Sequence, residues 1–177
     1  MTRYVDQGYE CHDRPAGTPL AWRIGVYGVV ERDNTVLMVD NIVSAGPTLS
    51  LPGGGVDLDA EETILEASIR EVYEETGYRF SPDPDSLTFL DEKFLRSPSG
   101  RYLHIIAFVV HGTVEEDPDP HWQFDPTEII AVKWIDPTTL IQTEVRRFHW
   151  NALIKTGHIT ADHLGADSVT ARNDEGM

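Results

Sequence analysis

The chain has 177 residues, of which 40% are hydrophobic, and its 30 acidic and 14 basic residues give a formal net charge of −16 at pH 7. This length and composition suit one domain with a buried core. The acidic balance argues against long nucleic acids, which bind through Lys and Arg. No apolar run approaches the roughly 20 residues that a membrane helix needs, so no membrane partner is expected. A small polyanionic substrate would be repelled unless a cation lay between it and the protein.

Both ends of the sequence are polar, and the middle has the hydrophobic content of a domain. Residues 1–20 lack the apolar segment of an export signal, and we expect them to form an irregular arm. The single cysteine, Cys11, excludes an internal disulfide and fits a reducing, cytoplasmic location. Residues 21–158 are expected to form the domain, and residues 159–177 a flexible tail.

Short apolar runs bounded by turn residues predict two hairpins and one further strand. Asp33-Asn34 is the turn signal of the first hairpin, and the sequence Ser-Pro-Ser-Gly separates the strands of the second. Trp22 and Trp134 lie at strand positions and are expected in the core. The predicted strands cover residues 23–30, 36–39, 87–96, 102–113 and 129–135.

Two amphipathic helices complete the pattern. The first is predicted over 62–76 and ends before Gly77, which suits a left-handed C-terminal cap. The second is predicted to begin at Asp136-Pro137, with Asp as the N-cap and Pro in the first turn. The expected apolar faces consist of Leu65, Ile69, Val72 and Tyr73 in the first helix and of Ile141, Val145, Phe148 and Ala152 in the second. Hairpins combined with helices indicate an α+β fold in which helices pack on a mixed sheet.

The end of the first helix gathers three carboxylates where the backbone dipole disfavours them. Glu71, Glu74 and Glu75 fall within about 100° of one another, opposite the predicted apolar face. Each is disfavoured by roughly 0.3 to 1 kcal/mol at a helix C-terminus, and Arg70 alone does not balance them. Either the three lie on a solvated face, or they bind a divalent cation. Carboxylate oxygens suit Mg²⁺ or Mn²⁺.

The surrounding residues resemble a known signature. The stretch LPGGGVDLDAEETILEASIREVYEETGY, residues 51–78, is similar to the Nudix hydrolase signature, which runs Gly, five residues, Glu, seven residues, then Arg-Glu-aliphatic-x-Glu-Glu-x-Gly-apolar. Glu62 and Arg70 have the expected spacing. Between Gly54 and Glu62 there are two extra residues, and this insertion falls within 57–61. The resemblance implies an α/β/α sandwich with a mixed central sheet.

The resemblance also implies a metal site and its supporting residues. It implies that Glu71, Glu74 and Glu75 bind Mg²⁺, with Mn²⁺ as a possible substitute, and that the region of Gly54 offers a carbonyl oxygen to the metal. Arg70 would pair with Glu62 and orient the start of the helix and the catalytic acids. These implied roles give the acidic helix end a chemical purpose.

A carboxylate must also accept a proton from the attacking water. One of Glu74 and Glu75 is a candidate, and so are three acids outside the signature. Among those three we favour Glu128, because it lies just before a predicted strand. The acids outside the signature are Glu115, Glu116 and Glu128.

The activity implied is that of a Mg²⁺-dependent pyrophosphohydrolase. Its substrate would be a small nucleoside diphosphate linked to another moiety: a nucleotide sugar, ADP-ribose, a dinucleoside polyphosphate or a modified nucleoside triphosphate. The alternative is a non-catalytic nucleotide sensor on the same fold. An isoprenoid diphosphate isomerase is disfavoured, because Cys11 lies in the arm. A homodimer is the default oligomer. Trp122 and Phe124, on an acidic loop, either sandwich a nucleobase or pack the loop onto the domain.

Overall fold

The computed structural model describes residues 3–6, 10–42, 46–97 and 99–160, and the account below concerns these residues. The sequence predicts a flexible tail over residues 159–177, of which residues 161–177 lie outside the described ranges. No helix in the described ranges combines the length and the hydropathy of a membrane span.

The described strands form one mixed sheet, as the sequence predicts. Their bounds are β1 (Tyr4–Val5), β2 (Cys11–His12), β3 (Leu20–Arg32), β4 (Thr35–Asn41), β5 (Leu49–Ser50), β6 (Gly53–Gly55), β7 (Phe80–Pro82), β8 (Thr88–Arg96), β9 (Tyr102–Val114) and β10 (Ile129–Ile135). The spatial order is β10-β4-β3-β9-β8-β1-β2, and β5, β6 and β7 pair with β4, β3 and β9. The long central strands β3 and β9 run parallel, whereas β8 and β9 are antiparallel.

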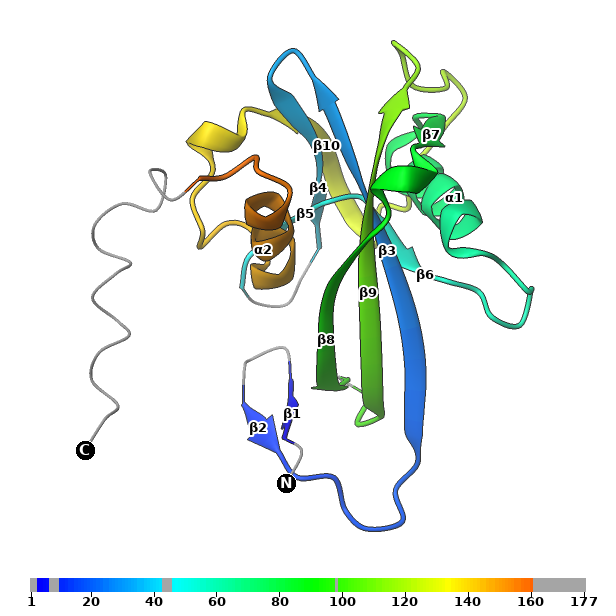
Figure 1. Ribbon diagram of the computed structural model, residues 1–177, viewed down its shortest axis with the longest axis vertical. Coiled ribbons are helices and arrows are strands. Elements are labelled where there is room, and N and C mark those ends of the chain that lie inside the picture. Colours follow the sequence, from blue (N-terminus) through cyan, green and yellow to red (C-terminus); the bar gives the residue numbers. More distant parts are fainter. Residues whose placement is uncertain (1–2, 7–9, 43–45, 98, 161–177) are drawn as a thin grey trace.

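Two helices, α1 (Ile64–Thr76) and α2 (Arg147–Lys155), lie on opposite sides of this sheet (Figure 1). Side chains alternate along β3, so Val26 and Val30 share a buried cluster with Val72 of α1, whereas Val29 packs in the cluster of Leu153 of α2. The arrangement is therefore the predicted α/β/α sandwich.

The N-terminal segment contains regular structure that its composition does not indicate. Residues 1–20, expected to be an irregular arm, include β1 and β2, which pair with each other. Val5 of β1 also pairs in parallel with Leu95 of β8, so the segment extends the sheet at one edge. Pairing of this kind depends on distant strands and leaves no local signal in the sequence.

The second helix begins later than predicted. Asp136 does cap a turn, but the turn is the short 3₁₀ helix η2 (Pro137–Thr139), and α2 starts at Arg147. The intervening chain is held by β5, because the backbone N–H of Arg146 donates to the carbonyl of Leu49 at 3.0 Å. Ile141, expected on the buried face, is 58% exposed. Long-range pairing has overridden the local helix signal.

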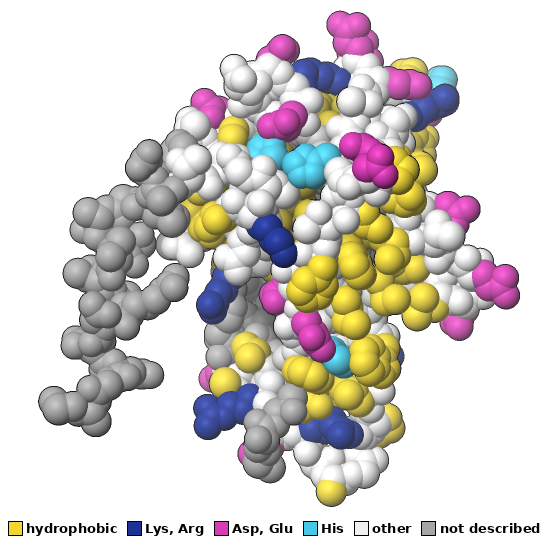
Figure 2. All heavy atoms as spheres, viewed as in Figure 1, with side chains coloured by type: hydrophobic (Ala, Val, Ile, Leu, Met, Phe, Trp, Pro, Cys, Tyr) yellow, Lys and Arg dark blue, Asp and Glu magenta, His cyan; other side chains and the backbone are white. Residues whose placement is uncertain are grey.

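The prediction that Trp22 lies in the core is wrong, since its side chain is 60% exposed. It lies near the start of β3 and packs against the ring of His104, with the ring centroids 4.1 Å apart and the planes tilted by 41°, and the His104 ring stacks on Phe94. Figure 2 shows hydrophobic side chains gathered on the molecular surface over strands of the central sheet. Trp134 is half-buried, and its indole N–H donates to the hydroxyl of Tyr78.

Candidate functional site

Helix α1 is fixed at both ends by its own sequence. Thr63 and Glu66 form a capping box: the Thr63 side chain accepts from the N–H of Glu66, and the Glu66 carboxylate accepts from the N–H of Thr63. At the other end Gly77 adopts the predicted left-handed conformation, with φ of 74°. The acidic residues of the signature are thus carried by a helix with defined limits.

The buried face of α1 is rotated from the predicted one. Ile69, expected in the core, is 42% exposed. The buried residues of the helix are Ala67, Ser68, Val72 and Thr76. At 100° per residue, Glu71 and Glu75 fall within the arc of these buried residues rather than opposite it. The two carboxylates therefore point inward, and Glu74 remains exposed.

The glycine strand β6 makes room for the two inward carboxylates. A β-carbon built on Gly54 would lie 2.4 Å from Oε2 of Glu71, so any side chain at this position would displace the carboxylate. The backbone N–H of Gly53 donates to Oε2 of Glu75 at 2.8 Å. Since β6 pairs with β3, both carboxylates lie against the central part of the sheet.

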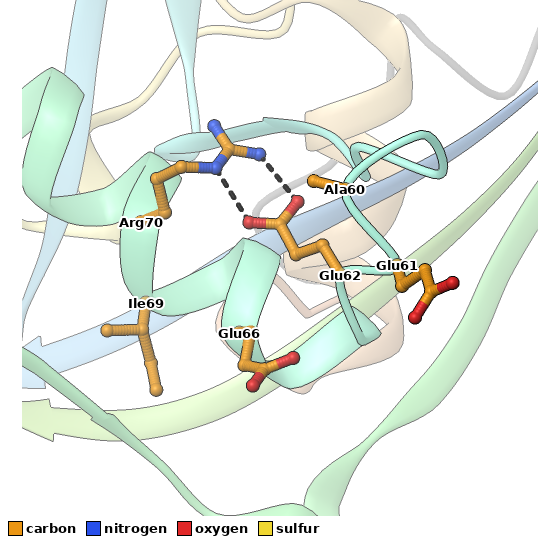
Figure 3. A pocket seen from close by; sticks show the side chains of 6 residues that line it. All are labelled: Ala60, Glu61, Glu62, Glu66, Ile69 and Arg70. Atoms are coloured by element: carbon orange, nitrogen blue, oxygen red, sulfur yellow. Dashed lines mark hydrogen bonds and ion pairs between the residues drawn. The ribbon is translucent and has the colours of Figure 1, made fainter.

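Arg70 and Glu62 make the pair that the resemblance implies. Nε and Nη2 of Arg70 donate to the two carboxylate oxygens of Glu62 at 2.7 and 2.8 Å (Figure 3). Nη2 also donates to the backbone carbonyl of Gly55. Nη1 lies 2.9 Å from Glu71 and 3.0 Å from Glu74. One guanidinium therefore links the start of the helix, the glycine strand and two of the signature carboxylates.

The two-residue insertion does not disturb this pair. The Asp57 carboxylate accepts from the backbone N–H groups of Asp59 and Ala60, which closes the extra residues into a turn. Glu61 adopts a positive φ of 57° at the end of this turn. The N–H of Asp57 then donates to Glu62, so the insertion itself helps to place the acid that Arg70 binds.

A hollow of about 480 Å³ lies beside the first half of α1 (Figure 3). Three carboxylates line it, and its one arginine is already paired with Glu62. Its charge therefore does not suit a phosphate, although its arginine lies 2.9 Å from the inward carboxylate of Glu71. The lining residues are Ala60, Glu61, Glu62, Glu66, Ile69 and Arg70.

Burial and like charge shape the ionisation of these acids. Burial raises the pKa of Glu75 to about 8, and the charge of Glu71 adds to the effect although the Gly53 N–H opposes it. Burial likewise raises the pKa of Glu71, against the lowering effect of Arg70. The hydrogen bonds from Arg70 hold the pKa of Glu62 at about 2. Burial thus favours the neutral, protonated forms of Glu71 and Glu75, and a bound divalent cation would favour their charged forms instead.

The donor set fits a hard divalent cation in type, but its members are spread out. Glu71 and Glu75 offer carboxylate oxygens beside the backbone of β6, whereas the exposed Glu74 bonds to Arg70. Among the described residues, the acids and histidine whose ligand atoms all lie within 4.8 Å of one another are Asp6, Glu10 and His12, in the N-terminal segment. There His12 and Asp6 already bond to each other at 2.7 Å.

The three candidate acids outside the signature lie in different surroundings. Glu128 is exposed at the entry to β10, and its charge is among those that raise the pKa of Glu75. Glu115 and Glu116 follow β9, where their backbone carbonyls accept hydrogen bonds from Arg32. Of these three acids, Glu128 is the one whose charge contributes to the raised pKa of Glu75.

Sequence reasoning did not anticipate the surroundings of three basic residues. The guanidinium of Arg23 in β3 lies against Gly55, 3.0 Å from where a β-carbon would stand. Arg146 precedes α2, and its charge lowers the pKa of Glu75. Lys93 in β8 lies over the ring of Phe148 at 4.3 Å. These residues come from separate elements, so their placement follows from the pairing of distant segments and could not be predicted from their spacing along the chain.

The aromatic loop packs onto the end of α1. The indole N–H of Trp122 donates to the carbonyl of Glu74 at 3.1 Å, and its ring lies against Gly77. The Trp122 and Phe124 rings are 5.7 Å apart and tilted by 50°. This contact favours loop packing over a nucleobase sandwich.

Comparisons with known proteins agree with the fold. The sequence model of the NUDIX domain family matches residues 20–155. A MutT protein from Methanosarcina mazei Go1 is similar, with 21% identity, a TM-score of 0.54, and coverage of 77% of this chain and 92% of that one. A MutT NUDIX hydrolase from Burkholderia pseudomallei has 21% identity, a TM-score of 0.51, and coverage of 73% and 95%. A UDP-X diphosphatase has 15% identity, a TM-score of 0.53, and coverage of 82% and 68%. A search of curated proteins gave no significant match.

Proposed function

The chain belongs to the NUDIX domain family, and on this premise we propose that it is a Mg²⁺-dependent pyrophosphohydrolase. Its proposed substrate is a small nucleoside diphosphate linked to another moiety. Nucleotide sugars, ADP-ribose, dinucleoside polyphosphates and modified nucleoside triphosphates all belong to this class. The non-catalytic sensor has no structural observation in its favour.

One observation carries the proposal: Glu71 and Glu75 are turned inward against the glycines of β6. Arg70 pairs with Glu71 at 2.9 Å, but burial still raises the pKa of both Glu71 and Glu75, so their charged forms remain unfavourable unless a cation binds them. In a sensor, apolar residues could fill this arc of α1 at lower free energy. The retained pair, with Glu74 beside it, suits a protein that binds a divalent cation for catalysis.

We assign the metal-binding role to Glu71, Glu74 and Glu75, with the carbonyl of Gly54 as a further oxygen ligand. When bound, Mg²⁺ would neutralise diphosphate oxygens, lower the pKa of an attacking water and stabilise charge on the leaving phosphate. The negative charge of the three carboxylates would hold the metal ion at this site. The glycine backbone allows them to approach the sheet.

Arg70 and Glu62 act as positioning residues in this proposal. The two-bond contact fixes the plane of the guanidinium, and the guanidinium in turn holds Glu71 and Glu74. Preorganisation of this kind places acidic groups before the substrate binds, so that less reorganisation is needed during the reaction.

The proton of the attacking water needs an acceptor, and we propose Glu128 for this role. It is exposed and therefore accessible to water, and its charge acts on Glu75 from outside α1. Glu74 and Glu75 are the alternatives within the signature. Glu128→Gln should lower kcat by about 10² to 10⁴-fold while leaving metal affinity intact. Loss of metal binding in that variant would instead make Glu128 a ligand.

The proposed activity is tested with a panel of the four substrate types in the presence of Mg²⁺. The parent protein should hydrolyse at least one of them, and Glu74→Gln and Glu75→Gln should abolish the turnover. Turnover that is equal in all three proteins and independent of metal would contradict the proposal. Tight binding of a nucleotide without turnover of any panel member would favour the sensor.

A further inference from the structure

Helix α1 covers only part of the sheet face on which it lies. Its buried residues share a cluster with Val26 of β3, and Phe108 of β9 packs against that cluster. Side chains alternate along a strand, so the residues of β3 that precede Val26 on this face are Ile24 and Trp22. Neither belongs to the buried clusters that the helices form with the sheet. The described residues therefore leave the rows nearest the start of β3 without a covering helix.

These uncovered rows are mostly aromatic and aliphatic, and we call them the open face. The open face consists of Trp22, Ile24, Phe89, Glu92, Phe94, His104 and Ile106, which strand register places on one side of β3, β9 and β8. Trp22 is 60% exposed and Phe89 is 47% exposed. Glu92 bonds to the ring of His104, so the acid of the open face is used within it. Figure 2 shows hydrophobic side chains gathered over these strands.

The apolar area of the open face suits the centre of a protein interface. A large aromatic side chain buries roughly 150 to 250 Å². At their exposed fractions, Trp22 and Phe89 together present on the order of 250 Å² of ring surface to solvent. A stable interface buries about 800 Å² per partner around a desolvated apolar centre. The open face could therefore provide that centre, and its borders would have to provide the remaining contacts.

Basic residues lie along one border of the open face. Arg96 is two residues beyond Phe94 in β8, so its side chain is on the same side of the sheet. Nε of Arg14 donates to the hydroxyl of Tyr4 at 3.2 Å. The Tyr4 ring contacts the Phe94 ring, and their centroids are 5.5 Å apart. Within the described ranges, neither arginine forms an ion pair with an acid.

Acidic residues lie along the opposite border. Strand β6 pairs with β3 on the edge away from β9 and β8. Directly after β6, the N–H of Val56 donates to the carbonyl of Ile24 at 2.9 Å, so the chain leaves the sheet beside the open face. The turn that follows carries Asp57, Asp59 and Glu61, all of them exposed. The open face thus has an acidic border next to β3 and a basic border next to β8.

We propose that the open face is the contact surface between two copies of this chain. One two-fold arrangement of two open faces sets the acidic border of each copy over the basic border of the other. Trp22 and Phe89 then lose their contact with water at the centre, and unlike charges meet at both borders. A second copy is the occupant that these borders favour, because every copy carries both charges. This inference goes beyond the proposed activity and does not depend on it.

Sedimentation equilibrium of the full chain, without metal or substrate, tests the proposed contact. The parent should approach twice its mass of 19.9 kDa as its concentration rises. Trp22→Ser should raise the dissociation constant of the dimer about tenfold or more, because it removes an aromatic anchor from the centre. Ile130→Ser is the matched control, since Ile130 is 55% exposed on β10 at the far edge of the sheet, and it should leave the dissociation constant unchanged. Thermal unfolding establishes that both variants are folded.

A charge exchange tests how the two borders meet. Arg96→Glu and Asp59→Lys should each weaken the dimer, because each places like charges opposite one another. The variant with both changes should regain most of the lost affinity, since its borders have exchanged their charges and still match. Added salt should weaken the parent dimer.

Three results would overturn the proposal. A parent that stays monomeric would exclude a second copy and leave residues 161–177 or a different protein as the occupant of the open face. A parent dimer that Trp22→Ser does not weaken, or that Ile130→Ser weakens equally, would place the contact elsewhere. A double variant of Arg96 and Asp59 that is weaker than either single variant would refute the opposed borders.

Discussion

The carboxylate of Glu71 occupies the space in which a side chain on Gly54 would begin, with Oε2 2.4 Å from the position of the absent β-carbon. This relationship explains both the glycine and the inward orientation of the acid. A glycine without a side chain allows a helix carboxylate to reach the backbone of a neighbouring strand. The relationship leads directly to a prediction about metal binding.

Gly54→Ala should lower the affinity for Mn²⁺ at least tenfold and leave the thermal stability nearly unchanged. The added methyl must move the carboxylate of Glu71, but Gly54 does not have a positive φ, so the backbone accepts alanine. Calorimetric titration with Mn²⁺ measures the effect. Gly25→Ala is the control, since its added methyl meets only ordinary contacts at 3.4 Å or more. Equal Mn²⁺ affinities for Gly54→Ala and the parent would contradict the packing argument.

The Arg70–Glu62 pair should contribute about 1 to 2 kcal/mol of coupling energy to the stability of the metal-free protein. The contact is bidentate, and the Glu62 side chain is only 11% exposed. Both properties distinguish this ion pair from the weak pairs of protein surfaces. A double-mutant cycle with Glu62→Gln and Arg70→Lys, followed by urea unfolding, measures the coupling. A coupling near zero would show that the pair is only a surface contact.

The coupling energy between Arg70 and Glu62 should depend on pH. Arg70 lowers the pKa of Glu62 from 4.5 to about 2. The unfolded chain therefore binds the proton more readily, and the stabilisation is present above pH 4.5 and is lost as pH falls toward 2. The coupling energy should decrease over this range, and a pH-independent coupling would contradict the assignment.

His149 should make the protein less stable below pH 6.5. It is buried, its Nδ1 accepts from the N–H of Leu51, and burial holds its pKa well below 6.5. The unfolded chain takes up a proton there that the folded chain excludes, so stability falls by about 1 to 2 kcal/mol between pH 6.5 and 5. His149→Asn should lose less stability than the parent over this interval. Urea unfolding at the two pH values makes the comparison, and identical losses would be inconsistent with a neutral buried imidazole.

Gly77→Ala should destabilise the fold by more than the usual cost of alanine in a left-handed conformation, which is about 1 to 2 kcal/mol. A β-carbon at this position would lie 2.6 Å from the Trp122 ring. Gly157→Ala is the matched control, because Gly157 also has a positive φ just beyond a helix but nothing within 4 Å. Denaturant unfolding should show the larger loss for Gly77→Ala. Equal losses would mean that the Trp122 contact is not formed.

Local patterns predicted the elements that depend on local signals. The strand at 129–135 has the predicted limits, and α1 ends at the predicted Gly77. The hairpin turn at Asp33-Asn34 also forms, and both residues adopt positive φ. Each of these features is encoded within a few neighbouring residues, and so it can be read from one sequence.

The failures share a different cause, which is contact between distant segments. Asp136 does cap a turn, but residue 145 pairs with β5, and the helix begins only after it. The rotation of α1 follows from packing against β3 and β6, which the spacing of apolar residues does not reveal. The basic residues Arg23 and Lys93 become neighbours through the register of three strands. The sequence indicated the acidic residues of the candidate site, whereas the placement of these basic residues required the tertiary structure.

The most direct test of the metal assignment is anomalous diffraction from crystals of the protein soaked in Mn²⁺. The account predicts a peak bound by carboxylate oxygens of Glu71 and Glu75, near the carbonyl of Gly54, and loss of that peak in Glu75→Gln crystals soaked in the same way. A well-ordered crystal saturated with Mn²⁺ that shows no peak beside these carboxylates would contradict the account.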